Sequence, residues 1–98
     1  MIVRIVQMTF QQDKVGDFVA LFESRKQAIR HFAGCTHLEL WQDANRPAIF
    51  FTYSHWESEA HLDHYRCSDF FKDTWARTKS LFANKPQAWS ITQQAIVS

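Results

Sequence analysis

The spacing of apolar residues along this chain switches between the period of a strand and the period of a helix, and this order constrains the fold most. Ile2–Phe10 is rich in β-branched residues and apolar on both faces, which predicts a strand covered on both sides. From Lys14 to Phe32 the apolar residues fall three or four apart, which predicts a long amphipathic helix. Asp13 is its predicted N-cap, and Gly34 stands where the helix would stop.

The middle of the chain has the pattern of a β-hairpin. Thr36–Gln42 alternates Leu38 and Leu40 with His37, Glu39 and Trp41, and Ala48–Trp56 is a run rich in aromatic and β-branched side chains. Between them, Asp43–Pro47 has the Asp, Asn and Pro chemistry of a turn. The two segments are therefore predicted to pair as antiparallel strands.

Two helices and one strand are predicted after the hairpin. Ser58 can cap a short helix that runs to about Arg66, and Ser68 can cap another with one broad apolar face. Pro86 belongs to a helix-breaking segment. The alternating run Gln87–Val97 then predicts the last strand.

The resulting order β-α-β-β-α-β is that of the ferredoxin-like fold, an α+β architecture with a four-stranded antiparallel sheet and helices on one face. With 98 residues, the chain is predicted to form a single domain, 1–98. Ile49, Phe51 and Tyr53 lie on one face of their strand and Phe50 and Trp56 on the other, so the uncovered face would be apolar. A two-fold homodimer that packs sheet on sheet would bury that face.

Charge and composition exclude several classes of partner. Eleven Lys and Arg against ten Asp and Glu are scattered along the chain, so the basic stripe of a nucleic-acid-binding protein is missing. No apolar run has the length of a signal peptide or a membrane span, which predicts a cytoplasmic protein without a membrane partner. Cys35 and Cys67 match neither a zinc knuckle nor a redox motif and are predicted to be free thiols.

The densest group of chemically useful side chains runs from Trp56 to Phe71, where the last hairpin strand passes into the first of the two short helices. A strand that ends in Trp56 and a helix that carries His and Tyr can line a pocket between sheet and helices. We expect this pocket to be lined by Trp56, His61, His64, Tyr65, Phe71 and Trp75.

These residues also carry a resemblance to a known family. The aromatic strand that ends at Trp56, the step Glu57–Ala60, His64 and the helix start Ser68–Phe71 resemble the antibiotic biosynthesis monooxygenase family of dimeric α/β barrels, including small proteins of the quinol monooxygenase type. That family contains cofactor-independent oxygenases of quinols and hydroxylated polycyclic aromatics, haem-degrading enzymes, and small proteins of no known activity. The resemblance thus implies a homodimer and a small aromatic substrate.

The function predicted on this basis is a cofactor-independent monooxygenase that oxidises a phenolic, quinol or polycyclic aromatic substrate with molecular oxygen. In this reading His64 accepts the phenolic proton, because its ordinary pKa lies near neutrality, and Tyr65 assists by hydrogen bonding. Trp56, His61, Phe71 and Trp75 would bind the substrate ring and exclude water. The alternative is a non-catalytic homodimer that binds a small hydrophobic metabolite.

Haem degradation and a metal site are not predicted. The haem-degrading relatives carry Trp where this chain has Tyr65, an axial His where it has Trp75, and a strand Asn near which the closest polar residue here is Gln7. His61 and His64 are three apart and could share an ion, but no third ligand is evident.

Three polar residues of the predicted strands have two possible orientations. His37 and His55 can point to either face of the hairpin. Arg4 could pair with a substrate oxyanion or with Glu39 if it faces the helices, or form an interface ion pair if it faces a dimer partner. We favour a structural salt bridge for Arg4.

Overall fold

A computed structural model describes residues 1–98 and has the predicted α+β, ferredoxin-like order of elements. A single turn of 3-10 helix, Gln12–Lys14, precedes the first α-helix. The other elements, in chain order, are β1 (Ile2–Thr9), α1 (Val15–Arg30), β2 (Cys35–Gln42), β3 (Ile49–Trp56), α2 (Glu59–Arg66), α3 (Asp69–Lys79) and β4 (Gln87–Ile91).

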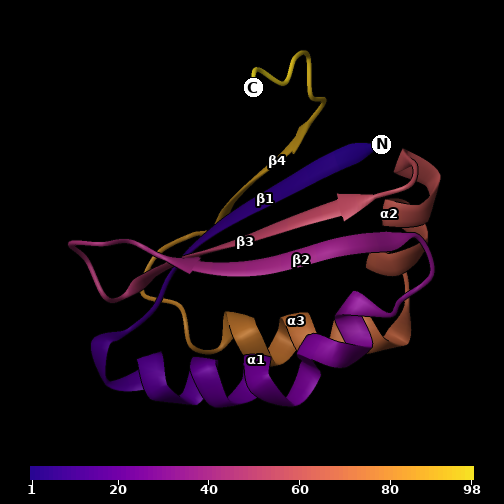
Figure 1. Ribbon diagram of the computed structural model, residues 1–98. Coiled ribbons are helices and arrows are strands. Elements are labelled where there is room, and N and C mark those ends of the chain that lie inside the picture. The colour runs from indigo at the N-terminus through magenta and orange to yellow at the C-terminus, as the bar shows by residue number, and fades with distance from the viewer.

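The four strands form one antiparallel sheet in the order β2-β3-β1-β4. Figure 1 shows α1 and α3 along one face of this sheet and no element on the other. The register places Arg4 opposite Ser54 of β3 and Ser90 of β4. Because side chains alternate along a strand, Arg4, Ser54 and Ser90 point to the helix-covered face together with Val6 and Met8. The remaining positions form the open face.

Local hydrogen bonds explain why the short elements begin where they do. The hydroxyls of Ser58 and Ser68 accept the amides of His61 and Phe71 at 3.2 and 3.1 Å, which confirms both predicted N-caps. In the hairpin turn, the Asp43 carboxylate accepts the amides of Asn45 and Arg46.

The predicted cap of α1 is wrong. Its N-cap position is Lys14, which makes no side-chain capping bond. Asp13 lies instead inside the 3-10 turn that precedes the helix. Because this turn already has helical backbone, Asp13 is not in the extended conformation that an N-cap residue needs.

The last strand is also shorter than predicted. It ends at Ile91, although alternation in the sequence continues to Val97. Ile91 pairs with Val3, so only Ile2 of β1 remains beyond this pair, and a strand that continued to Val97 would run past the end of β1. The residues that follow Ile91 extend away from the sheet (Figure 1).

Gly34 sets the junction between α1 and β2. Its φ of 90° lies in the left-handed region, and its carbonyl accepts the amide of Glu57 at 2.8 Å. A Cβ at this position would stand 2.4 Å from the Cβ of His61. Glycine therefore allows the start of α2 to pack directly against the beginning of β2.

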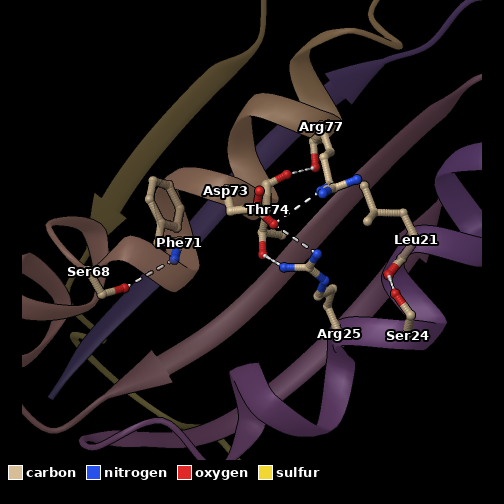
Figure 2. Close-up of polar contacts among 9 residues, drawn as sticks. Leu21, Ser24, Arg25, Ser68, Phe71, Asp73, Thr74 and Arg77 are labelled. Carbon is tan, nitrogen blue, oxygen red and sulfur yellow. Dashed lines mark hydrogen bonds and ion pairs between the residues drawn. The ribbon is translucent and has the colours of Figure 1, made fainter.

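Polar contacts tie α1 to α3 across the helix layer. The Arg25 guanidinium donates to the Asp73 carboxylate and to the Thr74 hydroxyl, both at 2.9 Å. Figure 2 shows Arg25 reaching from α1 toward these two residues, with Arg77 on the other side of Asp73. The two arginines hold the pKa of Asp73 below its ordinary value.

No helix of the chain combines the length and the apolar character that crossing a bilayer requires.

The buried side chains form two groups beneath the sheet. One contains Trp56, Leu62 and Tyr65 at the α2 end. The other contains Phe10 and Phe18, whose rings stack with centroids 4.1 Å apart. The space between these two groups holds the candidate site.

Candidate functional site

A cavity of about 270 Å³ lies between the helix-covered face of the sheet and the helices. This volume is close to the lower end of the ~300–1,000 Å³ typical of small-molecule sites. Most of its wall is apolar, and strands and helices both contribute. The lining residues are Arg4, Val6, Met8, Phe18, Phe22, Ile29, Leu38, Thr52, Ser54, Trp56, Tyr65, Arg66, Phe71, Thr74, Trp75, Thr78 and Ala88.

One side of the cavity is a continuous series of aromatic rings. Tyr65 stacks on Trp56 with centroids 4.7 Å apart, and Phe71 meets Tyr65 edge-on at 5.0 Å. Phe71 in turn stacks with Trp75 at 5.9 Å and an interplanar angle of 11°. Such flat, apolar surfaces are suited to hold a planar ring.

Trp56 is fixed by its own strand. Its side chain is 1% exposed, and its indole N–H donates to the Ser54 hydroxyl at 3.0 Å. The bond satisfies the one polar atom of the indole without a partner from outside β3. Trp56 is therefore a rigid part of the wall, because its side chain is buried and its indole N–H is already bonded within β3.

The Tyr65 hydroxyl is the polar group of the aromatic wall that has no hydrogen-bond partner within the chain. The residue is buried, and burial raises the pKa of its phenol well above the ordinary value. Every fully buried polar side-chain atom of the chain has a hydrogen-bond partner, whereas this hydroxyl has none. The hydroxyl therefore keeps some contact with solvent and stays protonated as a potential donor.

Two arginines supply the charge of the cavity. The Arg4 guanidinium donates to the Ser90 hydroxyl at 2.9 Å, and Arg66 at the end of α2 also lines the cavity. No carboxylate lines it. The apolar space thus has a cationic polar part, and neither arginine is among the six residues of the predicted pocket.

The salt bridge favoured for Arg4 is absent. Arg4 forms no ion pair, and Glu39 lies on the open face, where it accepts from Trp41 and contacts His37. β2, which carries Glu39, is not a neighbour of β1. Arg4 shares its face of β1 with Val6 and Met8, but Val3 and Ile5 make the opposite face apolar as well, so the sequence alone does not say which face lies on the cavity side.

Four of the six predicted pocket residues line the cavity together: Trp56, Tyr65, Phe71 and Trp75. His61 and His64 do not, contrary to expectation. The His61 imidazole lies 2.7 Å from the Ser58 hydroxyl and 3.7 Å from the Glu57 carboxylate, at the start of α2. Its Cβ and the ring carbons Cγ and Cδ2 lie against Gly34.

His64 is exposed and lies against the Phe32 ring, with centroids 5.8 Å apart. The buried side of α2 is formed by Leu62 and Tyr65, and neighbouring residues of a helix point about 100° apart. His64 is therefore turned away from the cavity that Tyr65 lines. The role predicted for it as a proton acceptor remains a prediction without a contact to support it.

The open face of the sheet carries a second group of polar and aromatic side chains. Trp41 stacks on Tyr53 at 4.7 Å, and the Tyr53 hydroxyl lies 2.7 Å from the His55 imidazole. His37 and His55 both lie on this face, with ring centroids 4.9 Å apart. Burial, and then the neighbouring His37, lower the pKa of His55. These residues lie across the sheet from the cavity.

The side chains that could bind a metal ion do not form a cluster. Cys35 and Cys67 are free, as predicted, and burial raises the pKa of the Cys35 thiol. No three of the His, Cys, Asp and Glu side chains gather around a point where an ion could bind.

Comparisons with known proteins agree with this architecture. Residues 1–77 match the family model described as antibiotic biosynthesis monooxygenase. No curated protein matches the chain. A solved structure described as an antibiotic biosynthesis monooxygenase superposes with a TM-score of 0.90 at 16% identity, covering 97% of this chain and 100% of the other.

Two further solved structures are similar. A conserved protein from Methanosarcina mazei Go1 gives a TM-score of 0.88 at 21% identity, with 96% of this chain and 94% of the other covered. Rv0793 from Mycobacterium tuberculosis gives 0.88 at 18% identity, with 99% and 98% covered. At these identities the similarity establishes a shared fold, so the chemistry has to be argued from the cavity.

Proposed function

We propose that this chain, which belongs to the antibiotic biosynthesis monooxygenase family, oxidises a phenolic, quinol or polycyclic aromatic substrate with molecular oxygen and without a bound cofactor. The observation that carries the proposal is the aromatic-walled cavity with the Tyr65 hydroxyl as a protonated donor. An apolar pocket of this kind, closed by the bound ring, provides what an electron-rich substrate needs to react with oxygen directly.

In the proposed reaction the substrate is the reductant and oxygen the oxidant. The ionised substrate gives an electron to oxygen, and the two radicals combine at a ring carbon. The substrate loses two hydrogens in total, and that carbon gains one oxygen atom as a carbonyl, while the second oxygen atom leaves as water. The substrate thus supplies all four electrons that oxygen takes up, and no external electron donor is required.

Each cavity residue has a separate part in this scheme. The rings of Trp56, Phe71 and Trp75 hold the substrate plane and exclude water. The Tyr65 hydroxyl donates to the phenolic oxygen of the substrate. Since the ring of Tyr65 is itself fixed by stacking on Trp56, its hydroxyl is held in place before the substrate binds.

We also propose that the chain functions as a homodimer through the open face of the sheet. On this face Trp41, Trp89 and Ile91 are 38%, 43% and 41% exposed. Trp89 and Ile91 belong to β4, whose five residues are all exposed in the single chain. A second copy packed sheet on sheet would bury this apolar surface.

The test is oxygen uptake by the purified, metal-stripped protein with a panel of hydroquinones, dihydroxynaphthalenes and anthrones, beside a blank that measures autoxidation. The proposal expects uptake above the blank for at least one compound, and less of it in a Trp75→Ala variant that opens the wall. Uptake at the blank level for every compound, together with ligand-induced stabilisation by the same compounds, would favour the non-catalytic metabolite-binding dimer.

A further inference from the structure

Two cationic side chains of the cavity have no anionic partner in the chain. Arg4 and Arg66 both line the cavity, and neither forms an ion pair. Arg25, which reaches the cavity-lining Thr74, is by contrast paired with Asp73. Arg4 uses one nitrogen for the neutral Ser90 hydroxyl, so its positive charge is not compensated.

The surroundings of Arg4 make this charge costly. Its side chain is partly buried in an apolar wall. Burial, and next the nearby Arg66, lower the pKa of its guanidinium, and Asp63 offsets this only in part. A partly buried arginine without an anionic partner is suited to bind an anion, since the negative charge would offset both the desolvation of the guanidinium and its repulsion by Arg66.

We propose that the cavity selects aromatic compounds in their anionic form, with the ligand oxyanion held by the guanidinium groups of Arg4 and Arg66 and the ring held against Trp56 and Trp75. The oxyanion is a carboxylate or an ionised phenolic oxygen on the ring. The inference rests on the proposed function only in taking this cavity as the substrate site.

The apolar wall argues for an aromatic anion over a small inorganic one. Phosphate or sulfate would have to give up its hydration beside Met8 and Phe22, which offer no hydrogen bonds in return. A ligand of naphthalene size with one charged group at its edge would fill the apolar space and reach the arginines with that group.

The inference also explains how the reaction proceeds without a base in the cavity. Its only titratable lining groups are Arg4, Tyr65 and Arg66, and none of them accepts a proton near neutral pH. Cations beside a phenolic oxygen favour its ionised form. The electron-rich anion therefore binds directly from solution, and Tyr65 donates to it without changing its own protonation.

Calorimetric titration with three matched compounds tests this. 1-Methoxy-2-naphthoate carries only a carboxylate, 4-nitro-1-naphthol carries only an ionisable phenol, and methyl 1-methoxy-2-naphthoate is neutral. We expect the carboxylate to bind roughly tenfold or more tighter than its ester, because hydrogen bonds to charged groups are the strong ones. If a phenolic oxygen is the anion recognised, affinity for the nitronaphthol will rise as it ionises.

Variants identify the residues responsible. Arg4→Gln and Arg66→Gln should each reduce the preference for the anion about tenfold while leaving affinity for the neutral ester unchanged. Arg46→Gln is the matched control, because Arg46 lies in the hairpin turn and its side chain does not line the cavity. Arg66 is exposed, so Arg66→Gln remains informative even if Arg4→Gln fails to fold.

Three results would overturn the inference: equal affinity of the wild type for charged and neutral compounds, a preference retained in both cavity variants, or no binding of any of the three. Anion-selective binding that depends on Arg4 or Arg66 but is accompanied by no oxygen uptake would uphold it and reject the oxygenase. Because these compounds report binding without turnover, the two failures are distinguishable.

Discussion

The ring of Tyr65 stacks on the indole of Trp56 with centroids 4.7 Å apart and planes inclined by 27°. This contact joins α2 to the end of β3, two elements that adjoin in sequence but are separated by the turn at Glu57 and Ser58. It fixes the aromatic wall of the cavity and leaves the Tyr65 hydroxyl without a partner in the chain. The packing role of the Tyr65 ring can therefore be separated from the binding role of its hydroxyl by removing the hydroxyl oxygen alone.

Tyr65→Phe should lower turnover, or affinity for the ionised ligand, by roughly tenfold, because it removes a hydrogen bond to a charged group. The thermal midpoint near neutral pH should change little, since the stacking on Trp56 remains. Calorimetric binding and oxygen uptake measure the first effect, and thermal unfolding the second. A large fall in the midpoint with unchanged affinity would mark the hydroxyl as a structural group.

The same variant should alter stability in alkali. Burial raises the pKa of Tyr65 in the folded chain above that of an unfolded tyrosine. The stabilisation this provides is fully present below about pH 10 and is lost as the pH rises toward the folded-state value. The wild type should lose free energy of unfolding over this range, and Tyr65→Phe should lose less. Denaturant melts at about pH 9 and above measure the difference.

Gly34→Ala should destabilise the fold by about 1–3 kcal/mol or more. The backbone there is left-handed, and the added Cβ would stand 2.4 Å from the Cβ of His61. Gly16→Ala is the matched control, because Gly16 lies in α1 with nothing near its missing Cβ and should gain about 0.5–1 kcal/mol. Urea unfolding of both variants gives the comparison. Equal effects would contradict the close contact between Gly34 and α2.

His64→Ala decides between the sequence pattern and the cavity geometry. The resemblance to the family predicts loss of turnover, whereas the geometry predicts that turnover and ligand affinity stay within about a factor of two, because the side chain lies on Phe32 outside the cavity. Oxygen uptake by the variant, relative to wild type, is the measurement. A loss of turnover in a protein of unchanged stability would restore the predicted proton acceptor.

Trp89→Glu should convert the proposed homodimer to a monomer. The side chain is 43% exposed on the open face of β4, and a carboxylate placed there would be buried opposite its symmetry copy. Ala76→Glu adds the same charge at an exposed position of α3 and should leave the dimer intact. Sedimentation measures the mass of each. A monomeric wild type would contradict the sheet-on-sheet arrangement.

Local patterns in the sequence predicted most of the fold. The period of the apolar residues and the caps Ser58 and Ser68 depend on neighbours within a few residues, so they identify helices and strands without tertiary information. The errors fall where an element depends on something distant. β4 stops near the end of β1, its one neighbour in the sheet, and no pattern within β4 carries that fact.

The residues of the cavity wall divide in the same way. The aromatic content from Trp56 to Trp75 was sufficient to predict a ring-lined pocket, because large apolar side chains at the end of a strand and on the buried side of helices face inward together. Which polar residues join them depends on the rotation of α2 about its axis and on the pairing of β1. His64 and Tyr65 are adjacent in sequence and point about 100° apart, so the packing of Leu62 and Tyr65 turns His64 outward. The register of β1 between β3 and β4 brings Arg4 to the cavity, which only the assembled sheet determines.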